Sequence, residues 1–525
     1  MRILISDPLS AEGLKILEER NIAFDVKTKL SPEELKQIIA DYDALIIRSG
    51  TKATAEIINA SKKLKVIGRA GVGVDNVDIE AATKKGILVM NTPGGNTIST
   101  AEHTVSMLLA LNRNIPQANL SIKNGRWDRK KFMSRELYGK RLGIIGLGRI
   151  GIEVARIAQA FGMKVSAYDP FLSEKKAEKF EIELVELKNL FERIDFLTVH
   201  TPLTSETEHM ISRPEFALMK KGIKIINCAR GGIIDEKALL EAIENGTVAG
   251  AALDVFENEP PTENRLLELD CVIATPHLGA ATEEAQVNVA VEVAEQVADL
   301  LEGKGIRNAL NYPCVENEAC RILEPYIRLA EKLGSFQSQI ISGHIKQVSI
   351  IYSGEVINHE VKPITIALIK GLLENILGES VNYVNAPFIA RERNIIIKET
   401  KVLEIEQFSN LISVEVQTNK GKSLVCGTLF TKNKQRIIRI NEFYIDTIPQ
   451  GNILITRSLD SPGLVGRIGT ILGENNINIA AMNFSRKGPG EESMVVLNVD
   501  DEISEEVLEQ IRQCKNVLDA KVIKL

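Results

Sequence analysis

An apolar strand that runs into a glycine-rich turn is the strongest constraint on this fold. Residues 144–151 read Ile-Ile-Gly-Leu-Gly-Arg-Ile-Gly, and a helical pattern follows over residues 152–160. In such a G-x-G-x-x-G turn, the glycines permit a tight bend, close approach of the backbone to a pyrophosphate, and close packing of helix on strand. The pyrophosphate lies at the N-terminus of the helix. The sequence thus predicts a dinucleotide site at Gly146, Gly148, Arg149, Ile150 and Gly151.

The next strand indicates which dinucleotide is bound. Residues 164–168 read as a strand that ends at Asp169. An acid about 20 residues after the glycines accepts hydrogen bonds from the adenosine ribose and repels a 2′-phosphate. We therefore predict NAD rather than NADP as the cofactor.

The first ~310 residues alternate short apolar runs with helical segments, which is typical of parallel sheets covered by helices. One such segment, residues 31–41, opens Ser-Pro-Glu-Glu, a helix start with an N-cap and a first-turn proline. The same pattern recurs from residue 141 to about 276, so we expect two α/β lobes.

After a break near residues 311–313 the pattern changes. Four strands are expected at residues 349–353, 393–398, 411–417 and 423–430, with one strong helix at 363–377. This segment reads as a separate α+β domain. After a second break at 449–451, the order strand, helix, strand, strand, helix, strand predicts a ferredoxin-like βαββαβ module.

Three chemically useful side chains follow predicted strands. Arg230 follows the run 225–227, Glu259 follows the segment 253–256, and His277 follows the run 272–275. Ligands of open α/β sheets bind beyond the carboxyl ends of the strands. Oxidation of a hydroxyl needs a base, and histidine is suited to that role. A carboxylate paired with the histidine would orient its ring. An arginine could bind a substrate carboxylate through two hydrogen bonds. Taken singly, these residues could be a surface charge, a loop acid and a structural histidine.

The other histidines are weaker candidates. His103 lies on a predicted helix and is expected to be structural, and His200 ends a strand near the cofactor edge. His209, His344 and His359 show no partner in the sequence.

Composition excludes several classes of protein. The sequence has 64 Lys and Arg residues against 70 Asp and Glu residues, which gives a net charge of −6. It contains no run of basic residues long enough to indicate nucleic-acid binding. No apolar run is long enough for a membrane span, and the N-terminus lacks a signal-peptide layout. The six cysteines form no C-x-x-C pair, so we expect no metal site and a cytoplasmic protein.

Several segments together resemble the D-isomer-specific 2-hydroxyacid dehydrogenases: Gly146–Gly151 with Asp169, Val199–Pro202, Asn227–Gly232, Glu259-Pro260 and Pro276-His277. The resemblance implies two Rossmann-like lobes, with a substrate lobe from residues 1–95 and 286–315 and an NAD lobe at 96–285. It assigns catalysis to Arg230, Glu259 and His277. It adds cofactor contacts at His200, Thr201, Pro202, Cys228, Ala229, Asp254 and Gly279.

Within the family, the nearest likeness is to long-form members that oxidise 3-phospho-D-glycerate at the head of L-serine synthesis. Their substrate loops look like residues 48–52, 71–76 and 95–97, which makes Arg48, Ser49, Gly73 and Asn96 the expected substrate contacts. Residues 127–132 look like the segment that lends a basic residue, here Arg129 or Lys130, across a dimer interface. A solvated turn is the alternative interpretation of this basic segment.

The C-terminal third resembles the regulatory part of those members. Residues 316–450 resemble their intervening domain, expected to bind an anion or substrate, or only to space the next domain. Residues 451–525 resemble an ACT domain, which implies L-serine as effector at Asp460 and Asn478 and a homotetramer. One departure is Arg457-Ser458, where the family often has His or Tyr shortly before the Asp.

Two alternatives stay open at this point. Another D-2-hydroxyacid, such as glyoxylate, hydroxypyruvate or lactate, could be the substrate, although Arg48 and the basic segment argue for a phosphate. A non-catalytic nucleotide-sensing regulator would show a broken Arg/Glu/His set or a nucleic-acid module, and the sequence shows neither.

Overall fold

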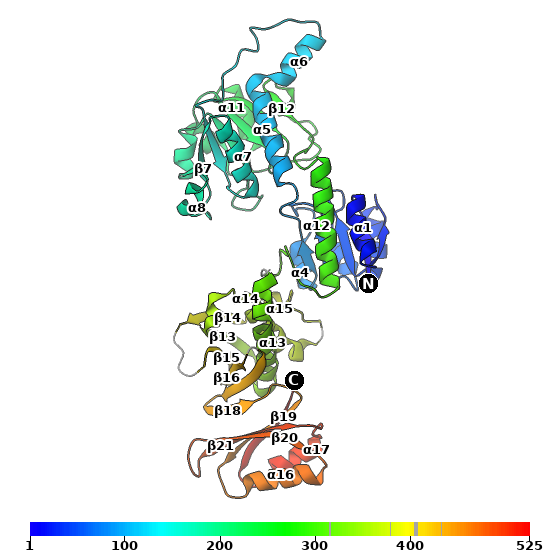
Figure 1. Ribbon diagram of the computed structural model, residues 1–525, viewed down its shortest axis with the longest axis vertical. Helices are drawn as coiled ribbons and strands as arrows, with labels where there is room; N and C mark the ends of the chain where they lie inside the picture. The colour runs from blue at the N-terminus through cyan, green and yellow to red at the C-terminus, as the bar shows by residue number, and fades with distance from the viewer. Residues whose placement is uncertain (314–316, 379, 404–407, 432) are drawn as a thin grey trace.

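The computed structural model describes residues 1–313, 317–378, 380–403, 408–431 and 433–525. Its strands form four sheets of five, seven, six and four strands. Down the long axis in Figure 1, the seven-stranded sheet comes first and is followed by the five-, six- and four-stranded sheets. The two predicted α/β lobes, the α+β segment and the βαββαβ module are all present. The domain limits given above remain predictions.

The first sheet is wholly parallel, in the order β2-β1-β3-β4-β5. Its strands are β1 (Arg2–Ile5), β2 (Ala23–Val26), β3 (Ala44–Ile47), β4 (Val66–Arg69) and β5 (Leu88–Met90), and its helices are α1 (Ala11–Glu19), α2 (Pro32–Ile38), α3 (Ala55–Ala60) and α4 (Ile79–Lys84). The predicted start of α2 is confirmed, because Ser31 and Glu34 form a capping box. A distant helix, α12 (Glu283–Leu301), packs beside α1 and buries Val293 and Val297 against this sheet (Figure 1). The lobe is thus built from two separated parts of the chain.

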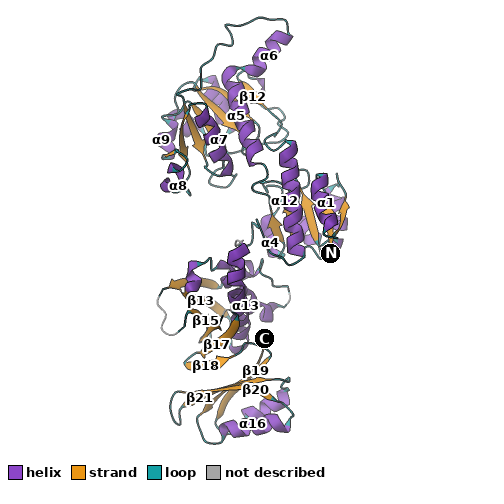
Figure 2. Ribbon diagram, viewed as in Figure 1, coloured by secondary structure: helices purple, strands orange, loops and turns teal. Residues whose placement is uncertain are grey.

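The second sheet carries the glycine-rich turn. Its order is β12-β11-β10-β9-β6-β7-β8, and all its pairs are parallel. Its strands are β6 (Arg141–Ile145), β7 (Lys164–Tyr168), β8 (Glu183–Leu184), β9 (Phe196–Val199), β10 (Ile223–Asn227), β11 (Val248–Leu253) and β12 (Val272–Ala274). Its helices are α5 (Thr97–Arg113), α6 (Ile115–Lys123), α7 (Arg149–Ala160), α8 (Glu174–Glu178), α9 (Leu187–Phe191), α10 (Arg213–Leu218) and α11 (Glu236–Glu244). In Figure 2, α5 and α7 lie side by side against this sheet.

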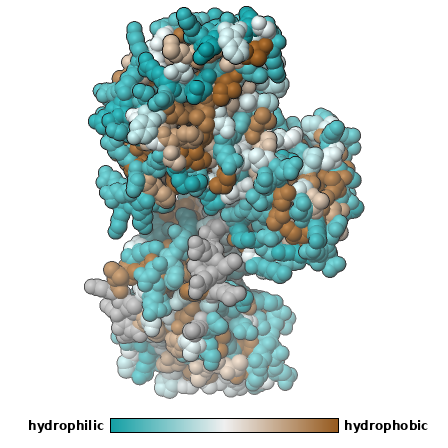
Figure 3. Space-filling model, turned by 45° about the horizontal axis from the view of Figure 1, so that its top comes forward, coloured by the Kyte–Doolittle hydropathy of each residue, from teal (hydrophilic) through white to brown (hydrophobic). Residues whose placement is uncertain are grey.

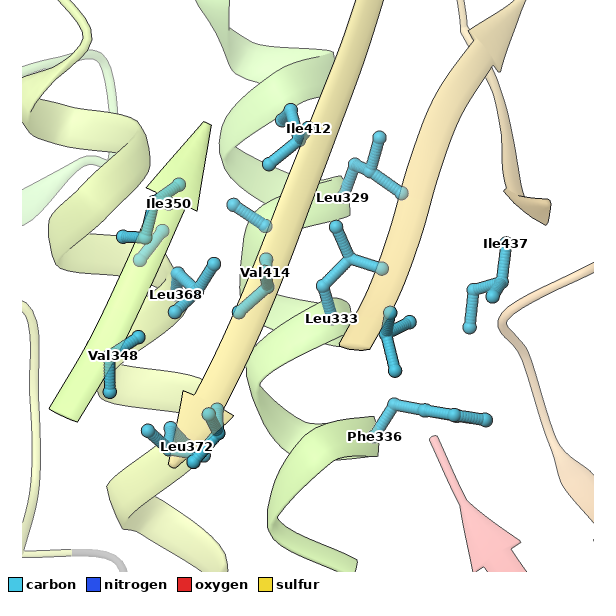
Figure 4. Packing of buried hydrophobic residues seen from close by; sticks show 14 of the residues in the cluster. Leu329, Leu333, Phe336, Val348, Ile350, Leu368, Leu372, Ile412, Val414 and Ile437 are labelled. Atoms are coloured by element: carbon cyan, nitrogen blue, oxygen red, sulfur yellow. The ribbon is translucent and has the colours of Figure 1, made fainter. Parts of the chain in front are cut away.

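The third sheet, in the order β14-β13-β15-β16-β17-β18, packs on two long helices. The strands are β13 (Ile345–Gly354), β14 (Ile396–Val402), β15 (Asn410–Thr418), β16 (Lys422–Phe430), β17 (Lys434–Ile440) and β18 (Phe443–Thr447), and the helices are α13 (Asn317–Ile340), α14 (Lys362–Leu377) and α15 (Ala386–Glu392). Figure 4 shows Leu329, Leu333 and Phe336 of α13 meeting the sheet and α14 in a buried core. The predicted helix at 363–377 is confirmed by α14, whereas α13, which contains Pro325, was not predicted.

The fourth sheet has the predicted βαββαβ order. Its elements are β19 (Asn452–Leu459), α16 (Leu464–Glu474), β20 (Ile479–Arg486), β21 (Glu492–Val499), α17 (Glu505–Arg512) and β22 (Val517–Lys524). Helices α16 and α17 cover one face of the sheet. The other face buries Ile453, Ile455 and Val496 in the same core as Val416 and Phe443 of the third sheet. These two sheets therefore share one continuous core.

The face drawn in Figure 3 is mainly hydrophilic. Its apolar residues form separate patches, most of them on the two upper lobes. Among the described residues, no helix is long and apolar enough to cross a membrane.

Candidate active site

The glycine-rich turn has the geometry that its sequence predicts. Gly146 has φ 92°, and a Cβ there would lie 2.6 Å from the His200 carbonyl oxygen. A Cβ on Gly151 would lie 2.2 Å from the carbonyl oxygen of Gly146, so only glycine lets α7 pack this closely on β6. Within the described part of the chain, no atom lies within 4 Å of a Cβ at Gly148, which leaves open space at the N-terminus of α7. That space suits a pyrophosphate.

Asp169 is fixed beside this turn. Its Oδ2 accepts a hydrogen bond from the Leu147 amide at 2.8 Å, and its Oδ1 accepts one from the Phe171 amide at 2.9 Å. Each carboxylate oxygen can accept a second hydrogen bond. The residues present therefore fit NAD: an open cradle for the pyrophosphate and a fixed acid for the ribose.

The chain brings Arg230, Glu259 and His277 to one edge, after the neighbouring strands β10, β11 and β12. His277 Nδ1 lies 2.9 Å from Glu259 Oε2, and Glu259 Oε1 accepts a hydrogen bond from the Phe256 amide at 3.2 Å. Burial alone would raise the pKa of Glu259, but the hydrogen bond and charge of His277 outweigh it and hold that pKa below its ordinary value. With Nδ1 engaged, Nε2 is the nitrogen left to exchange a proton.

Arg230 reaches from the NAD lobe to the first lobe. Its Nε donates to Asp75 Oδ2 at 2.9 Å, and its Nη1 donates to the Ala229 carbonyl at 2.6 Å. A Cβ on Gly73 would lie 1.7 Å from Arg230 Nη2, so a side chain at this position would displace the guanidinium. The site is therefore formed between the two lobes. Sequence reasoning had missed the contact with Asp75, although Asp75 stands in the quoted loop.

The loop that carries Arg48 and Ser49 is held by hydrogen bonds to the side chains of Asp7 and Asn76. Asp7 Oδ2 accepts hydrogen bonds from the amides of Arg48 at 2.6 Å and Thr51 at 3.0 Å. Asn76 Nδ2 donates to the carbonyl oxygens of the same two residues. Ser49 is left exposed at the tip of an ordered loop.

Sequence reasoning also missed Arg69, the last residue of β4. Its side chain is largely enclosed, and its Nε has no hydrogen-bond partner among the described residues. Burial, and next the positive charge of Arg230, lower the pKa of Arg69 to about 10. Its signal in the sequence was weak: an arginine at a strand end within Gly-Arg-Ala-Gly. Arg48 and Arg230 also act on Arg69 as positive charges, and Asp75 and Asp7 offset part of their effect.

The remaining histidines differ in their surroundings. His200 is buried, which lowers its pKa to about 4, and its Nε2 lies 3.1 Å from Thr198 Oγ1. The expectation that His209 has no partner was wrong, because its Nε2 lies 3.2 Å from Glu257 Oε1. His103 lies on α5, as predicted, and contacts Asp254.

Three predicted site residues lie in other parts of the molecule than Arg69, Arg230 and His277. Arg129 follows α6, which projects at the far end of the NAD lobe in Figure 1. In the ACT-like module, Asp460 Oδ2 accepts a hydrogen bond from Arg486 at 2.8 Å, and Asn478 donates to Asp500 at 2.7 Å. Asp460 and Asn478 therefore have different partners within one chain.

Comparison with known proteins agrees with this arrangement. Residues 105–279 match the D-isomer specific 2-hydroxyacid dehydrogenase NAD binding domain, residues 322–441 the D-3-phosphoglycerate dehydrogenase intervening domain, and residues 452–516 the ACT domain. The D-3-phosphoglycerate dehydrogenase of Methanocaldococcus jannaschii is 48% identical over 100% of both chains. The chain belongs to the D-3-phosphoglycerate dehydrogenase family.

Other relatives extend the likeness. The D-3-phosphoglycerate dehydrogenase of Bacillus subtilis is 44% identical over 100% of this chain and 99% of its own. Among solved structures, D-lactate dehydrogenase from Aquifex aeolicus, complexed with NAD and lactic acid, matches with a TM-score of 0.54 and 30% identity. That match covers 60% of this chain and 100% of the other. The two-lobe part is thus similar to D-lactate dehydrogenase, and the family's intervening and ACT domains follow it.

Proposed function

We propose that this chain oxidises 3-phospho-D-glycerate to 3-phosphooxypyruvate with NAD, the first step of L-serine synthesis. The observation that carries the proposal is that Arg230 and the His277–Glu259 pair follow neighbouring strands at the sheet edge that also bears the dinucleotide turn, with Arg69 and Arg48 close to Arg230. Full-length relatives named D-3-phosphoglycerate dehydrogenase support it.

Each residue has a defined task in this proposal. Arg230 binds the substrate carboxylate and polarises the forming carbonyl, while Asp75 fixes the angle of its guanidinium. His277 Nε2 accepts the proton of the hydroxyl, and Glu259 stabilises the resulting imidazolium through Nδ1. NAD, held at the glycine-rich turn and Asp169, would supply the acceptor for the hydride that leaves the carbon carrying this hydroxyl. The balance is one hydride and one proton removed per molecule oxidised.

The phosphate is assigned to Arg48 and Arg69, with Ser49 and Asn96 as further contacts. A phosphate dianion offsets the repulsion between Arg69 and Arg230, which an uncharged substrate end leaves in place. Arg129 would reach the phosphate only from a second copy of the chain. The apolar side chains around it support such a contact, because Trp127 is 77% exposed and Met133 is 82% exposed.

The experiment compares kcat/KM for 3-phosphoglycerate and for glycerate in the parent protein and in Arg69→Met. Loss of a charged hydrogen bond of about 1.5–3 kcal/mol predicts a 10- to 150-fold loss with phosphoglycerate and little change with glycerate. The control is Lys52→Met, which removes an exposed cation from the neighbouring loop. Equal losses on both substrates would refute the phosphate assignment and favour another D-2-hydroxyacid.

We also propose that L-serine regulates the enzyme by binding at Asp460 and Asn478. The protein is further proposed to be a homotetramer and to be cytoplasmic. The ACT match supports an amino-acid effector. The free thiols of Cys228, Cys271 and Cys426 suit a reducing compartment. Initial rates with and without L-serine, together with light scattering, test the effector and the assembly. No change in rate with serine, or a mass other than four chains, would contradict the respective part.

A further inference from the structure

Asp254 organises the segment that carries His277. Its side chain is fully buried at the end of β11. Its carboxylate accepts hydrogen bonds from Thr275 Oγ1 at 2.6 Å, the Leu278 amide at 2.7 Å and the Gly279 amide at 2.8 Å. Its carbonyl oxygen accepts one from the His277 amide at 3.0 Å. A single aspartate therefore holds the backbone on both sides of the histidine.

His277 needs this support because its backbone is left-handed, with φ 54°. Residues with a Cβ disfavour this region, so neighbouring contacts must impose it. The direction of the imidazole follows from this backbone conformation. Any loosening of residues 275–279 therefore moves Nε2 relative to the substrate.

Helix α5 forms the other side of this support. The hydroxyls of Ser99 and Thr100 donate to the Gly279 carbonyl at 2.9 and 3.0 Å. One turn further along, His103 Nε2 lies 3.2 Å from Asp254 Oδ1 and 3.2 Å from Thr275 Oγ1. Three side chains on one side of α5 thus hold the start and the end of residues 275–279.

The same helix connects this segment to the substrate loops. Asn96, one of the proposed substrate contacts, is the N-cap residue of α5. Its Oδ1 is buried and has no hydrogen-bond partner among the described residues. The helix therefore sets the position of His277 with respect to the substrate as well as to the NAD lobe.

A metal site is the competing interpretation of the same groups. Ligand atoms of His103, Cys228 and Asp254 all lie within 4.8 Å of one another. However, both oxygens of Asp254 already accept hydrogen bonds from protein donors. Burial, and next the charge of Asp254, raise the pKa of the Cys228 thiol to about 12, which keeps it protonated. A hydrogen-bond network accounts for these contacts better than a metal does.

We propose that His103 is a positioning residue for the oxidation, acting through Asp254 and Thr275 on His277. The inference rests on the proposed role of His277 as the base. A histidine serves here because its Nε2 reaches both Asp254, at the end of β11, and Thr275, at the end of β12, from a helix on the neighbouring layer.

The test compares His103→Leu with His103→Gln, whose amide nitrogen can take the place of Nε2. For each variant, kcat, KM for 3-phosphoglycerate, the Kd of NADH and the midpoint of thermal unfolding are measured. His209→Leu is the matched control, since it removes a histidine with a carboxylate partner at 3.2 Å outside this network. His277→Ala is assayed in parallel.

We expect His103→Leu to lower kcat about 10- to 100-fold, as a displacement near 1 Å of a catalytic group does. KM and the unfolding midpoint should match those of His209→Leu, the Kd of NADH should rise by a smaller factor than kcat falls because Asp254 and Gly279 are also expected cofactor contacts, and His103→Gln should recover most of kcat. An unchanged kcat in His103→Leu, a loss of NADH affinity as large as the loss of kcat, or no recovery in His103→Gln overturns the proposal. Turnover that survives in His277→Ala instead refutes the assignment of the base.

Discussion

The contact between Glu259 and His277 allows a quantitative prediction for Glu259→Gln. At the observed 2.9 Å the two charges attract with about 1.4 kcal/mol in the dielectric of water. The water value is appropriate because the two side chains are 39% and 49% exposed. The amide keeps an oxygen acceptor for Nδ1 but loses the charge that stabilises the imidazolium. We therefore expect kcat to fall about tenfold.

The sign of the pH effect follows from the same contact. The pKa of Glu259 is held below its ordinary value, so the carboxylate stays ionised until the pH falls through that lowered value. The kcat of the parent should therefore fall at low pH as Glu259 is protonated, and Glu259→Gln, whose amide does not titrate, should lack this fall. Initial rates of NADH formation across pH measure it. Glu257→Gln, which alters the exposed pair with His209, is the control. The same fall at low pH in Glu259→Gln as in the parent would refute the role given to this carboxylate.

Three further substitutions test other parts of the structure. Asp169→Ala should raise the Kd of NAD about tenfold and permit turnover with NADP, and unchanged coenzyme selectivity would contradict the ribose assignment. Gly73→Ala places a Cβ 1.7 Å from Arg230 Nη2 and should lower kcat/KM about 100-fold, while Gly469→Ala, with open space around it, should not. Leu333→Ala in the core of Figure 4 should cost about 2–5 kcal/mol in denaturant unfolding, and a smaller loss would show that the core closes over the cavity.

The sequence predicts best where a local pattern determines local structure. The glycine-rich turn between β6 and α7 and the capping box of Ser31 depend on neighbours in the chain, and both are present. Arg230 and His277 could be placed together because parallel strands bring their carboxyl ends to one edge. Both residues follow strands of the same sheet, so their placement does not depend on the other lobe.

What the sequence could not show depends on contacts between distant segments. Arg69 becomes a candidate site residue only because the fold brings it close to Arg230, which lies far away in the sequence. No spacing along the chain predicts that contact. Helix α13 contains Pro325, which normally disfavours a helix interior, and the packing of Leu333 and Phe336 in the core outweighs that preference. In both cases tertiary structure overrides the local signal.

The closeness of Arg48, Arg69 and Arg230 affects the stability of the folded protein as well as its substrate specificity. The lowered pKa of Arg69 means that the folded protein carries this charge less favourably than the unfolded chain does. Without substrate, Arg230 adds to the repulsion, so Arg69→Met should raise the midpoint of thermal unfolding even as it removes the phosphate contact. Bound 3-phosphoglycerate should then stabilise the parent protein more than the variant, because only the parent has a buried charge for the phosphate to neutralise. Thermal unfolding with and without the substrate measures both effects. A variant that is less stable than the parent without substrate would show that Arg69 is held by structural contacts and is not strained for binding.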